Sequence, residues 1–555
     1  MPQDDFAVDQ NGGNTEETGP FGDTDGSRAD IHDLLQGFVG FSGSAAYGSL
    51  RVGNHELRAR VVVGGKGAGK SVYLRRLQAD AVKRSGVYSE RTPVYADTIQ
   101  RDVPKTESVV RICHWYPEDF LTETWKWLWR RAIMRSLVSH LLCAKELNTH
   151  LPEEARKELE EDYKDLYRTF RKPVSVYSQL RNIISTAKSK RELSSYLDDP
   201  QWDELEVTVR ESLRECPPIC FYIDAVDDEF AHAPMYWLVC QKGLFYEVMR
   251  LLREDHLGGR LHVMICVRDS VFSSVLRSEH GGRYRESPYI RLLDWSLDAL
   301  QYFLRAKLET LPKRFFPHGE ERTTANWLGL EKVATNREVP LEEPVEEYIL
   351  RHIRPLPRDI VILGNRLCRA LDQARANGEE GLSIEAIAEV VSETAKKCGD
   401  EQLTICANQI SADMMPAHAY QHRYGEVYTG ANAYAPVVSQ HLKEFLHDHV
   451  GRDRFDNGYC RKVAALGGKE FAANSDVLSV LWQNGLIGYG DGDIHGQDVI
   501  FYRMDDKSDE LVLPMDRDFY VLHSCLIDSA GIEPVGPPVF PYRRPRRSAA
   551  AGQTS

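Results

Sequence analysis

Between positions 59 and 310 the chain alternates short, nearly unbroken apolar runs with longer segments whose apolar residues recur at helical spacing. Unbroken apolar runs are typical of parallel strands that helices cover on both faces. Strands are predicted at 60–63, 109–115, 219–224, 261–267 and 289–293. Helices are predicted from 70 into the 80s, at 118–142 and at 234–255. This alternation predicts an α/β fold built on a parallel sheet.

Residues 144–215 interrupt the alternation with charged stretches such as E-E-A-R-K-E-L-E-E-D-Y-K-D-L. Such stretches are typical of helices with a solvated face, and a docking surface is the alternative interpretation. A helical insertion within the α/β core is therefore predicted.

The strand-like runs stop after position 310, and residues 344–397 have the spacing of three helices, which predicts a helical lid. Helical patterns at 435–450 and 475–484 are followed by the turn-rich G-L-I-G-Y-G-D-G-D and the strand-like V-I-F-Y-R-M. Helices that precede a Gly/Asp hairpin form the outline of a winged helix.

The two ends of the chain differ in composition from the segments between them. Residues 1–28 hold seven acidic residues and one basic residue among small polar ones, which predicts a disordered acidic tail. Residues 531–555 are predicted to be a disordered basic tail with four arginines, Arg543, Arg544, Arg546 and Arg547. The predicted organisation between the tails is an α/β core at 29–310, a helical lid at 311–400, a linker at 401–432 and a winged-helix domain at 433–530.

The overall composition disfavours several classes of protein. A net charge of −14 argues against a surface that is basic throughout, although a local basic groove or the basic tail remains a candidate DNA contact. The eleven cysteines lack C-x-x-C spacing, and apolar runs long enough to span a membrane are missing from the sequence. The polar, acidic start M-P-Q-D-D-F-A does not have the pattern of a signal peptide. We therefore expect a reduced, cytoplasmic setting and no membrane partner.

The stretch V-V-V-G-G-K-G-A-G-K-S carries the most specific chemistry. Its pattern G-x-x-x-x-G-K-S predicts a phosphate-binding loop, because glycines let successive backbone N–H groups point at phosphate oxygens. The side chain of Lys70 is expected to reach the terminal phosphates, and the Ser71 hydroxyl to hold Mg²⁺. The predicted nucleotide-binding residues are Gly64, Gly65, Lys66, Gly67, Ala68, Gly69, Lys70 and Ser71.

A phosphate-binding loop needs an acidic partner at the end of a neighbouring strand. The stretch P-P-I-C-F-Y-I-D-A-V-D-D-E-F supplies one, because its apolar run leads directly into Asp224. Asp224 is predicted to approach Mg²⁺, and Asp227 or Asp228 to orient an attacking water. Glu229 is a further candidate for that role.

Several arginines are candidates for contact with the nucleotide. Arg268 ends the predicted strand L-H-V-M-I-C-V and is a candidate sensor of the terminal phosphate, with local pairing to Asp269 as the alternative. Arg283 and Arg285 lie in a loop before the last strand and are candidates for an arginine finger that reaches a neighbouring subunit. Arg358 is predicted at a helix N-terminus, where a cation opposes the helix dipole and therefore calls for an anionic partner.

Together these motifs resemble the STAND class of P-loop NTPases, which are relatives of AAA+ and origin-recognition-type ATPases. The stretch Asp224-Ala225-Val226-Asp227-Asp228 is similar to the acidic motif of that class, and Arg268 matches its arginine after the next strand. Arg358, in P-R-D, looks like the sensor arginine of AAA+ relatives. The resemblance implies an ATPase that uses Mg²⁺ and whose lid and winged helix rearrange, and bacterial members frequently serve in antiphage defence.

We therefore expect an ATP-hydrolysing molecular switch that self-associates or acts on an effector protein. The sequence shows no recognisable repeat array or effector signature, which suggests that a partner protein supplies the missing function or that the helical insertion and winged helix do. An ATP-controlled DNA-binding protein is the alternative. The segment S-D-V-L-S-V-L-W-Q-N has no Lys or Arg for phosphate contacts, but the nearby basic residues Arg452, Arg454, Arg461, Lys462 and Lys469 keep this alternative open. A small-molecule kinase using the same loop is a third possibility, for which the long lid is a poor match.

Overall fold

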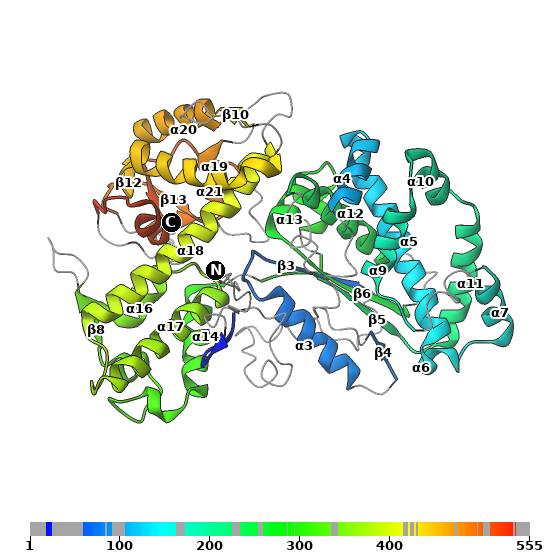
Figure 1. The fold of residues 1–555 in the computed structure, drawn as a ribbon, viewed down its shortest axis with the longest axis horizontal. Coiled ribbons are helices and arrows are strands. Elements are labelled where there is room, and N and C mark those ends of the chain that lie inside the picture. The colour runs from blue at the N-terminus through cyan, green and yellow to red at the C-terminus, as the bar shows by residue number, and fades with distance from the viewer. Residues whose placement is uncertain are drawn as a thin grey trace, which may run out of the picture.

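The computed structural model describes most of the chain between residues 18 and 539, and Figure 1 shows its arrangement. The described residues are 18–24, 59–83, 86–90, 106–162, 172–224, 234–253, 259–285, 287–293, 295–334, 342–413, 420–421, 427–428, 431–471, 476–496, 498–502, 511–536 and 539. Within this part of the chain, helices long and apolar enough to cross a membrane are absent.

A five-stranded parallel sheet lies at the centre of the N-terminal part. Its strands are ordered β4-β5-β6-β3-β7, so β6 lies between β3 and β5. The chain alternates strands and helices here as predicted, and the α/β fold with a parallel sheet is confirmed. The bounds are Ala59–Val63 for β3, Tyr88–Ser89 for β4, Ile219–Ile223 for β5, Leu261–Val267 for β6 and Ile290–Leu292 for β7.

One predicted strand is wrong. Residues 109–115 belong to helix α4, Thr106–Trp115. The β-branched pair Val109 and Val110 suggested a strand, but the buried residues Val109, Ile112 and Cys113 recur at helical spacing and face one core. The strand next to β5 is instead β4, whose two residues are too short to give a sequence signal.

The sheet has helices on both faces, and alternate strand residues enter two separate cores. Val61 and Val63 pack in the core shared with α5 (Glu118–Cys143) and α12 (Pro234–Arg253). Val62 packs on the other side, in a core shared with α3 (Lys70–Val82) and the lid. Figure 1 shows α3 on one side of the sheet and α12 and α5 on the other. The three helices were predicted within a few residues of these bounds.

The predicted helical insertion is confirmed for the residues that the structure describes. It comprises α6 (Lys145–Asn148), α7 (Glu153–Asp162), α9 (Val176–Thr186), α10 (Lys190–Leu197) and α11 (Gln201–Glu215). A buried arginine joins the insertion to the core, because Arg130 of α5 pairs with Glu206 of α11 at 2.5 Å and with Glu247 of α12 at 2.9 Å. Charges this deeply buried hold a structure together only when they are paired.

The predicted lid contains three main helices, as expected, and the last of them extends beyond the predicted boundary. These helices are α16 (Val345–Arg351), α17 (Pro357–Ala376) and α18 (Ile384–Asp413). The predicted linker at 401–432 is wrong in its first part, because residues 401–413 are helical. Helix α18 therefore runs from the lid to the C-terminal domain without a break (Figure 1).

Further elements connect the sheet to the main helices of the lid. Between β7 and α16 the chain forms α14 (Leu297–Thr310), the 3-10 helix η4 (Lys313–Phe315), α15 (Thr324–Leu328) and the antiparallel pair β8 (Lys332–Ala334) and β9 (Glu342–Pro344). The prediction that strands stop after 310 is therefore wrong for this short pair.

The prediction of a disordered tail over 1–28 is wrong for residues 18–24. Strands β1 (Thr18–Gly19) and β2 (Gly22–Asp23) form a hairpin that docks on α17. Phe21 at its tip is buried against Trp327, and the Phe21 N–H donates to Asn365 Oδ1 at 2.8 Å. A single aromatic anchor orders this segment despite its polar composition.

The C-terminal domain combines helices with a four-stranded antiparallel sheet of order β12-β15-β13-β14. Helices at 435–450 and 475–484 and the strands after them were predicted; helix α20 was not. Ile532 is buried, so the predicted tail at 531–555 does not begin at 531. The elements are α19 (Ala431–Phe445), the π-helix η5 (Leu446–Val450), β12 (Arg454–Asp456), α20 (Asn457–Phe471), α21 (Val477–Gln483), β13 (Ile487–Gly490), β14 (Ile500–Phe501), β15 (Phe519–Leu522) and α22 (Ser524–Ala530).

The contact between α5 and α12 gives a test of this core. A Cβ added at Gly243 of α12 would lie 2.5 Å from the Trp125 Cβ and 2.9 Å from the Lys126 backbone nitrogen, both on α5. We expect Gly243→Ala to lower the free energy of unfolding by about 1–3 kcal/mol, because rigid backbone must shift. Chemical denaturation measures this change.

Gly468→Ala is the matched control, because Gly468 also lies in a helix and its added Cβ would meet nothing within 4 Å. That variant is expected to gain about 0.5–1 kcal/mol from its higher helix propensity. Equal effects of the two substitutions would contradict the close packing of α5 on α12.

Candidate functional site

Three sequence-predicted residues meet at the edge where the parallel strands end. Val63 of β3 pairs with Val267 of β6, and Ile223 of β5 pairs with Ile265 of β6. The residues that follow these strand ends, Gly64, Arg268 and Asp224, therefore share one edge of the sheet. Gly64 lies closest to β6, where its N–H donates to the Val267 carbonyl at 3.3 Å. In open α/β sheets this edge is where ligands bind.

The glycine-rich loop connects β3 to helix α3 and encloses an ammonium group. Gly67 and Gly69 have φ angles of +90° and +89°, a backbone conformation that favours glycine. Helix α3 begins at Lys70, whose Nζ donates to the carbonyls of Gly64 and Gly65 at 2.9 Å each. The loop therefore curls around the lysine, and the N-terminus of a thirteen-residue helix opens onto it.

A buried tryptophan fixes the middle of the loop. Trp295 follows β7, and its indole N–H donates to the Ala68 carbonyl at 3.1 Å. A Cβ added at Gly64 would lie 3.1 Å from the Ala68 Cβ and 3.3 Å from the Leu293 Cβ. The loop thus fits between β6 and the chain after β7 with little room for larger side chains at Gly64.

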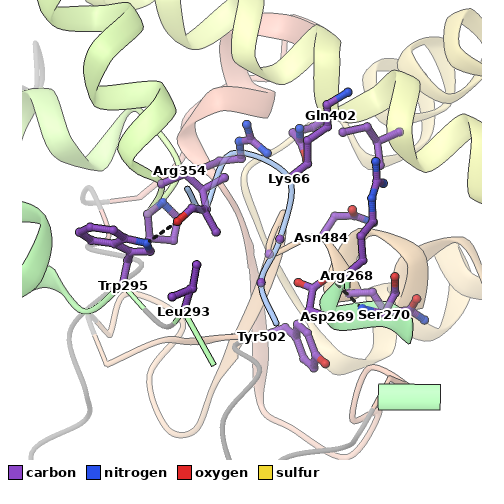
Figure 2. Close-up of a pocket in the computed structure, with 18 of the residues that line it drawn as sticks. Lys66, Arg268, Asp269, Ser270, Leu293, Trp295, Arg354, Gln402, Asn484 and Tyr502 are labelled. Atoms are coloured by element: carbon purple, nitrogen blue, oxygen red, sulfur yellow. Dashed lines mark hydrogen bonds between the residues drawn. The ribbon is translucent and has the colours of Figure 1, made fainter. Parts of the chain in front are cut away.

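A cavity beside this loop is lined by several parts of the chain that are far apart in sequence. Figure 2 shows Lys66 of the loop, Arg268 and Asp269 after β6, Arg354 of the lid, Gln402 of α18 and Asn484 of the C-terminal domain around it. The C-terminal domain also contacts the core here, because the Tyr502 hydroxyl lies 2.9 Å from Ser273 Oγ of helix α13 (Asp269–Leu276). A ligand in this cavity would therefore touch the loop on its Gly64–Ala68 side together with the lid and the C-terminal domain, whereas Lys70, Ser71 and Asp224 do not line the cavity.

Arg358 lies against the glycine-rich loop. Helix α17 begins with Pro357 in its first turn, as predicted, and the Arg358 N–H points at the Gly67 carbonyl at 3.4 Å. A Cβ added at Gly67 would lie 3.2 Å from the Arg358 Cβ. The guanidinium pairs with Glu401 of α18, with Nη2 3.5 Å from Oε2. The structure therefore brings Arg358 to the loop, although the two are far apart in sequence.

The acidic strand is described as far as Asp224. Its side chain is buried, with 2% of the residue exposed, and the Tyr177 hydroxyl donates to its backbone carbonyl. Asp227, Asp228 and Glu229 lie outside the described residues. Arg268 lies at the N-cap of α13, and its N–H donates to Gln241 Oε1 of α12 at 3.2 Å.

Arg283 and Arg285 lie away from the loop. They precede β7, and together with Arg253 at the end of α12 they line a second cavity. Because α12 ends and β6 and β7 begin at this side, the cavity lies toward the edge opposite the glycine-rich loop. These arginines therefore do not converge with Lys70 and Asp224 within one chain.

Four residues near the loop or its neighbouring strands have no local sequence signal. Arg354 is buried and makes a two-point pair with Asp359 of α17, at 2.9 Å for each contact, which fixes the start of that helix beside the loop. Gln402 and Asn484 reach the cavity from distant segments, and Glu401 meets Arg358 only through the fold. In the sequence, only the P-R-D stretch that follows Arg354 predicts that this part of the lid lies near an anionic ligand.

Glu90 is a buried carboxyl for which the sequence carries no local signal. It directly follows β4, its N–H donates to the Cys220 carbonyl of β5 at 3.0 Å, and 4% of the residue is exposed. Burial raises the pKa of Glu90 from an ordinary value of 4.5 to about 8, against the opposing effect of a hydrogen bond from the Tyr222 backbone. The folded protein therefore keeps this carboxyl protonated at neutral pH.

This shift predicts a pH dependence of stability. Because the folded pKa exceeds the unfolded one, the favourable contribution of Glu90 is fully present below about pH 4.5 and is lost as pH rises toward 8. Glu90→Gln keeps the neutral shape, so we expect its melting temperature relative to wild type to rise between pH 5 and pH 8. Calorimetry at several pH values measures this, with exposed Glu211→Gln as control. A difference that does not change with pH would contradict the assignment.

No protein-family model matches the chain, and a search of curated proteins finds no match. The described residues show by themselves a parallel five-stranded sheet with helices on both faces, whose carboxyl edge carries a glycine-rich loop, a buried aspartate and an arginine. This arrangement is compatible with an α/β fold of the P-loop NTPase kind.

Proposed function

We propose that this protein is an ATP-binding and ATP-hydrolysing molecular switch that uses Mg²⁺. The observation that carries the proposal is the loop around Lys70, which lies at the same sheet edge as Asp224 and Arg268 and beside a cavity with walls from the lid and C-terminal domain. Successive N–H groups, a helix N-terminus and a lysine suit a polyphosphate better than they suit a neutral ligand.

The residues present fit a nucleotide and its metal. Gly67 and Gly69 have left-handed backbone conformations that favour glycine, and a Cβ added at Gly64 would crowd Ala68 and Leu293, so the loop has the tight glycine-dependent path of a phosphate-binding loop. Ser71 and Asp224 are oxygen donors, as Mg²⁺ prefers. Within the described ranges, groups of three or more His, Cys, Asp or Glu that could hold a metal are absent. The ion would therefore rely on phosphate oxygens and water for its remaining ligands.

The proposed roles follow from these positions. Lys70 and the loop N–H groups bind and orient the phosphates, and Arg268 stabilises negative charge on the terminal one. Magnesium bound by Ser71 and Asp224 would neutralise phosphate charge. From the sequence we assign Asp227 or Asp228 to hold the attacking water.

A switch is favoured over a free-standing enzyme because the lid and C-terminal domain line the same cavity. Contacts that differ between a triphosphate and a diphosphate would bias the positions of both parts. The resemblance to STAND and AAA+ ATPases supports the same interpretation, together with action through self-association or an effector protein. A cavity closed only by a small lid would have favoured the kinase alternative.

The DNA-binding alternative receives less support. Helix α21, the presumed reading helix of a winged helix, has six buried residues of its seven and contains no Lys or Arg. Of the nearby basic residues, Arg454 is buried, where its Nη1 donates to the carbonyls of Ile494 and Gly496 at 2.7 and 2.9 Å. The others, Arg452, Arg461, Lys462 and Lys469, are exposed and remain available to an anionic partner. The four arginines of the basic tail lie outside the described residues. These observations favour a C-terminal domain that packs against protein.

Lys70→Ala tests the proposed function. The substitution removes the ammonium group that donates hydrogen bonds to the Gly64 and Gly65 carbonyls. We expect ATP hydrolysis to fall at least about a hundredfold, the size typical of losing one preorganised charge contact. Phosphate release and nucleotide titration measure the change.

Lys83→Ala is the control, because it removes the same charge from an exposed position at the far end of α3. It is expected to leave hydrolysis unchanged. A Lys70→Ala protein that is folded and hydrolyses ATP at the wild-type rate would refute the proposed function.

A further inference from the structure

Arg358 occupies a position that a cation does not favour by itself. It lies in the first turn of α17, where the helix dipole carries partial positive charge, and the helix is twenty residues long. The Arg358 N–H is directed at the Gly67 carbonyl, so the residue is held at the glycine-rich loop. Asp359 of the same turn is engaged by Arg354, so an anion near the Arg358 guanidinium would stabilise this arrangement further.

Glu401 supplies that anion in the structure. The Arg358 Nη2 lies 3.5 Å from Glu401 Oε2, and the two side chains are 27% and 35% exposed. An ion pair with this exposure is weak, because water competes for both partners. A more highly charged anion at the loop would therefore displace the carboxylate at small cost.

The neighbours of Glu401 on α18 connect it to the C-terminal domain. Gly399 lies so close to α22 that an added Cβ would be 2.2 Å from the Cys525 carbonyl oxygen. Asp400 accepts hydrogen bonds from Lys443 Nζ at 2.7 Å and from Ser529 Oγ at 2.6 Å. Gln402 lines the cavity beside the loop. Four consecutive residues thus contact α22, α19, Arg358 and the candidate site.

We propose that Glu401 is a positioning residue that sets the preference of the site for a nucleoside triphosphate over a diphosphate. Its carboxylate competes with the terminal phosphate for the Arg358 guanidinium. A diphosphate lacks that phosphate and leaves the Arg358–Glu401 pair in place. The inference rests on the proposed nucleotide function and adds to it a carboxylate that opposes binding of the terminal phosphate at Arg358.

A structural consequence follows from the competition. When the terminal phosphate takes Arg358, Glu401 loses its partner in the lid, while Asp400 keeps its contacts to Lys443 and Ser529. Helix α18 then loses its ion pair with Arg358 at the loop but keeps its contacts with the C-terminal domain. The identity of the nucleotide would thereby reach the C-terminal domain through a single turn of helix.

The test compares affinities for a non-hydrolysable ATP analogue and for ADP, both with Mg²⁺, using the full-length protein. Glu401→Gln is expected to raise affinity for the triphosphate analogue about two- to fivefold and leave ADP affinity unchanged, because an exposed pair is worth about that much. Arg358→Gln is expected to abolish most of the preference for the triphosphate. The double variant should behave like Arg358→Gln, because the two residues act on one another.

Glu393→Gln is the matched control, since it removes the same charge from an exposed position two turns earlier on α18. It should leave both affinities unchanged. A purely structural role for Glu401 would instead move both affinities in parallel.

The outcomes separate the two proposals. If wild type binds nucleotide but Glu401→Gln and Glu393→Gln have the same triphosphate preference, this inference is overturned and the proposed function stands. If wild type binds neither ligand, both are overturned. Should Glu401→Gln not fold, as judged by thermal unfolding, the preference measured for Arg358→Gln decides, and an unchanged preference overturns the inference.

Discussion

The pairing of β6 with both β3 and β5 is the constraint on which the rest of this molecule depends. These three strands are parallel, and their shared register ends them at one edge. Because the residue after each strand is fixed by that register, a slip of one position would turn every strand side chain to the opposite face. Gly64, Asp224 and Arg268 therefore converge only while both cores of the sheet remain intact. The chemistry at the edge is a result of backbone pairing and burial, not of side-chain contacts between the three residues.

Helix α18 adds to this edge what the sheet cannot provide. It packs on α17 of the lid, on α19 and α22 of the C-terminal domain and on α12 of the core. A helix that belongs to several packed units transmits a shift of any one of them, because packed interfaces slide or jump and do not deform gradually. Its continuity through residues 401–413 matters for this reason, since a flexible linker there would have uncoupled the lid from the C-terminal domain.

The sequence was most informative where the signal is local. The glycine-rich loop, the strand before Asp224 and the N-terminus of α17 were predictable, because glycine spacing, apolar runs and proline act on neighbouring residues. Helix α4 was mistaken for a strand because short apolar runs with β-branched residues suit either structure. Glu401 and Glu90 could not have been predicted, since one gains its role from a contact 43 residues away in sequence and the other from burial beside a two-residue strand.

The N-terminal hairpin has a practical consequence for anyone who shortens this chain. Composition alone suggests that residues up to 28 can be removed without harm, yet Phe21 fills the space above Gly364, where an added Cβ would lie 2.4 Å from its ring. A chain that starts at 29 would leave that hollow and the Trp327 ring open to water, and a lid with an uncovered apolar hollow tends to attract foreign apolar groups. Aggregation or low stability of such a shortened protein would then be caused by the loss of Phe21. Properties measured on its lid would not apply to the full-length chain.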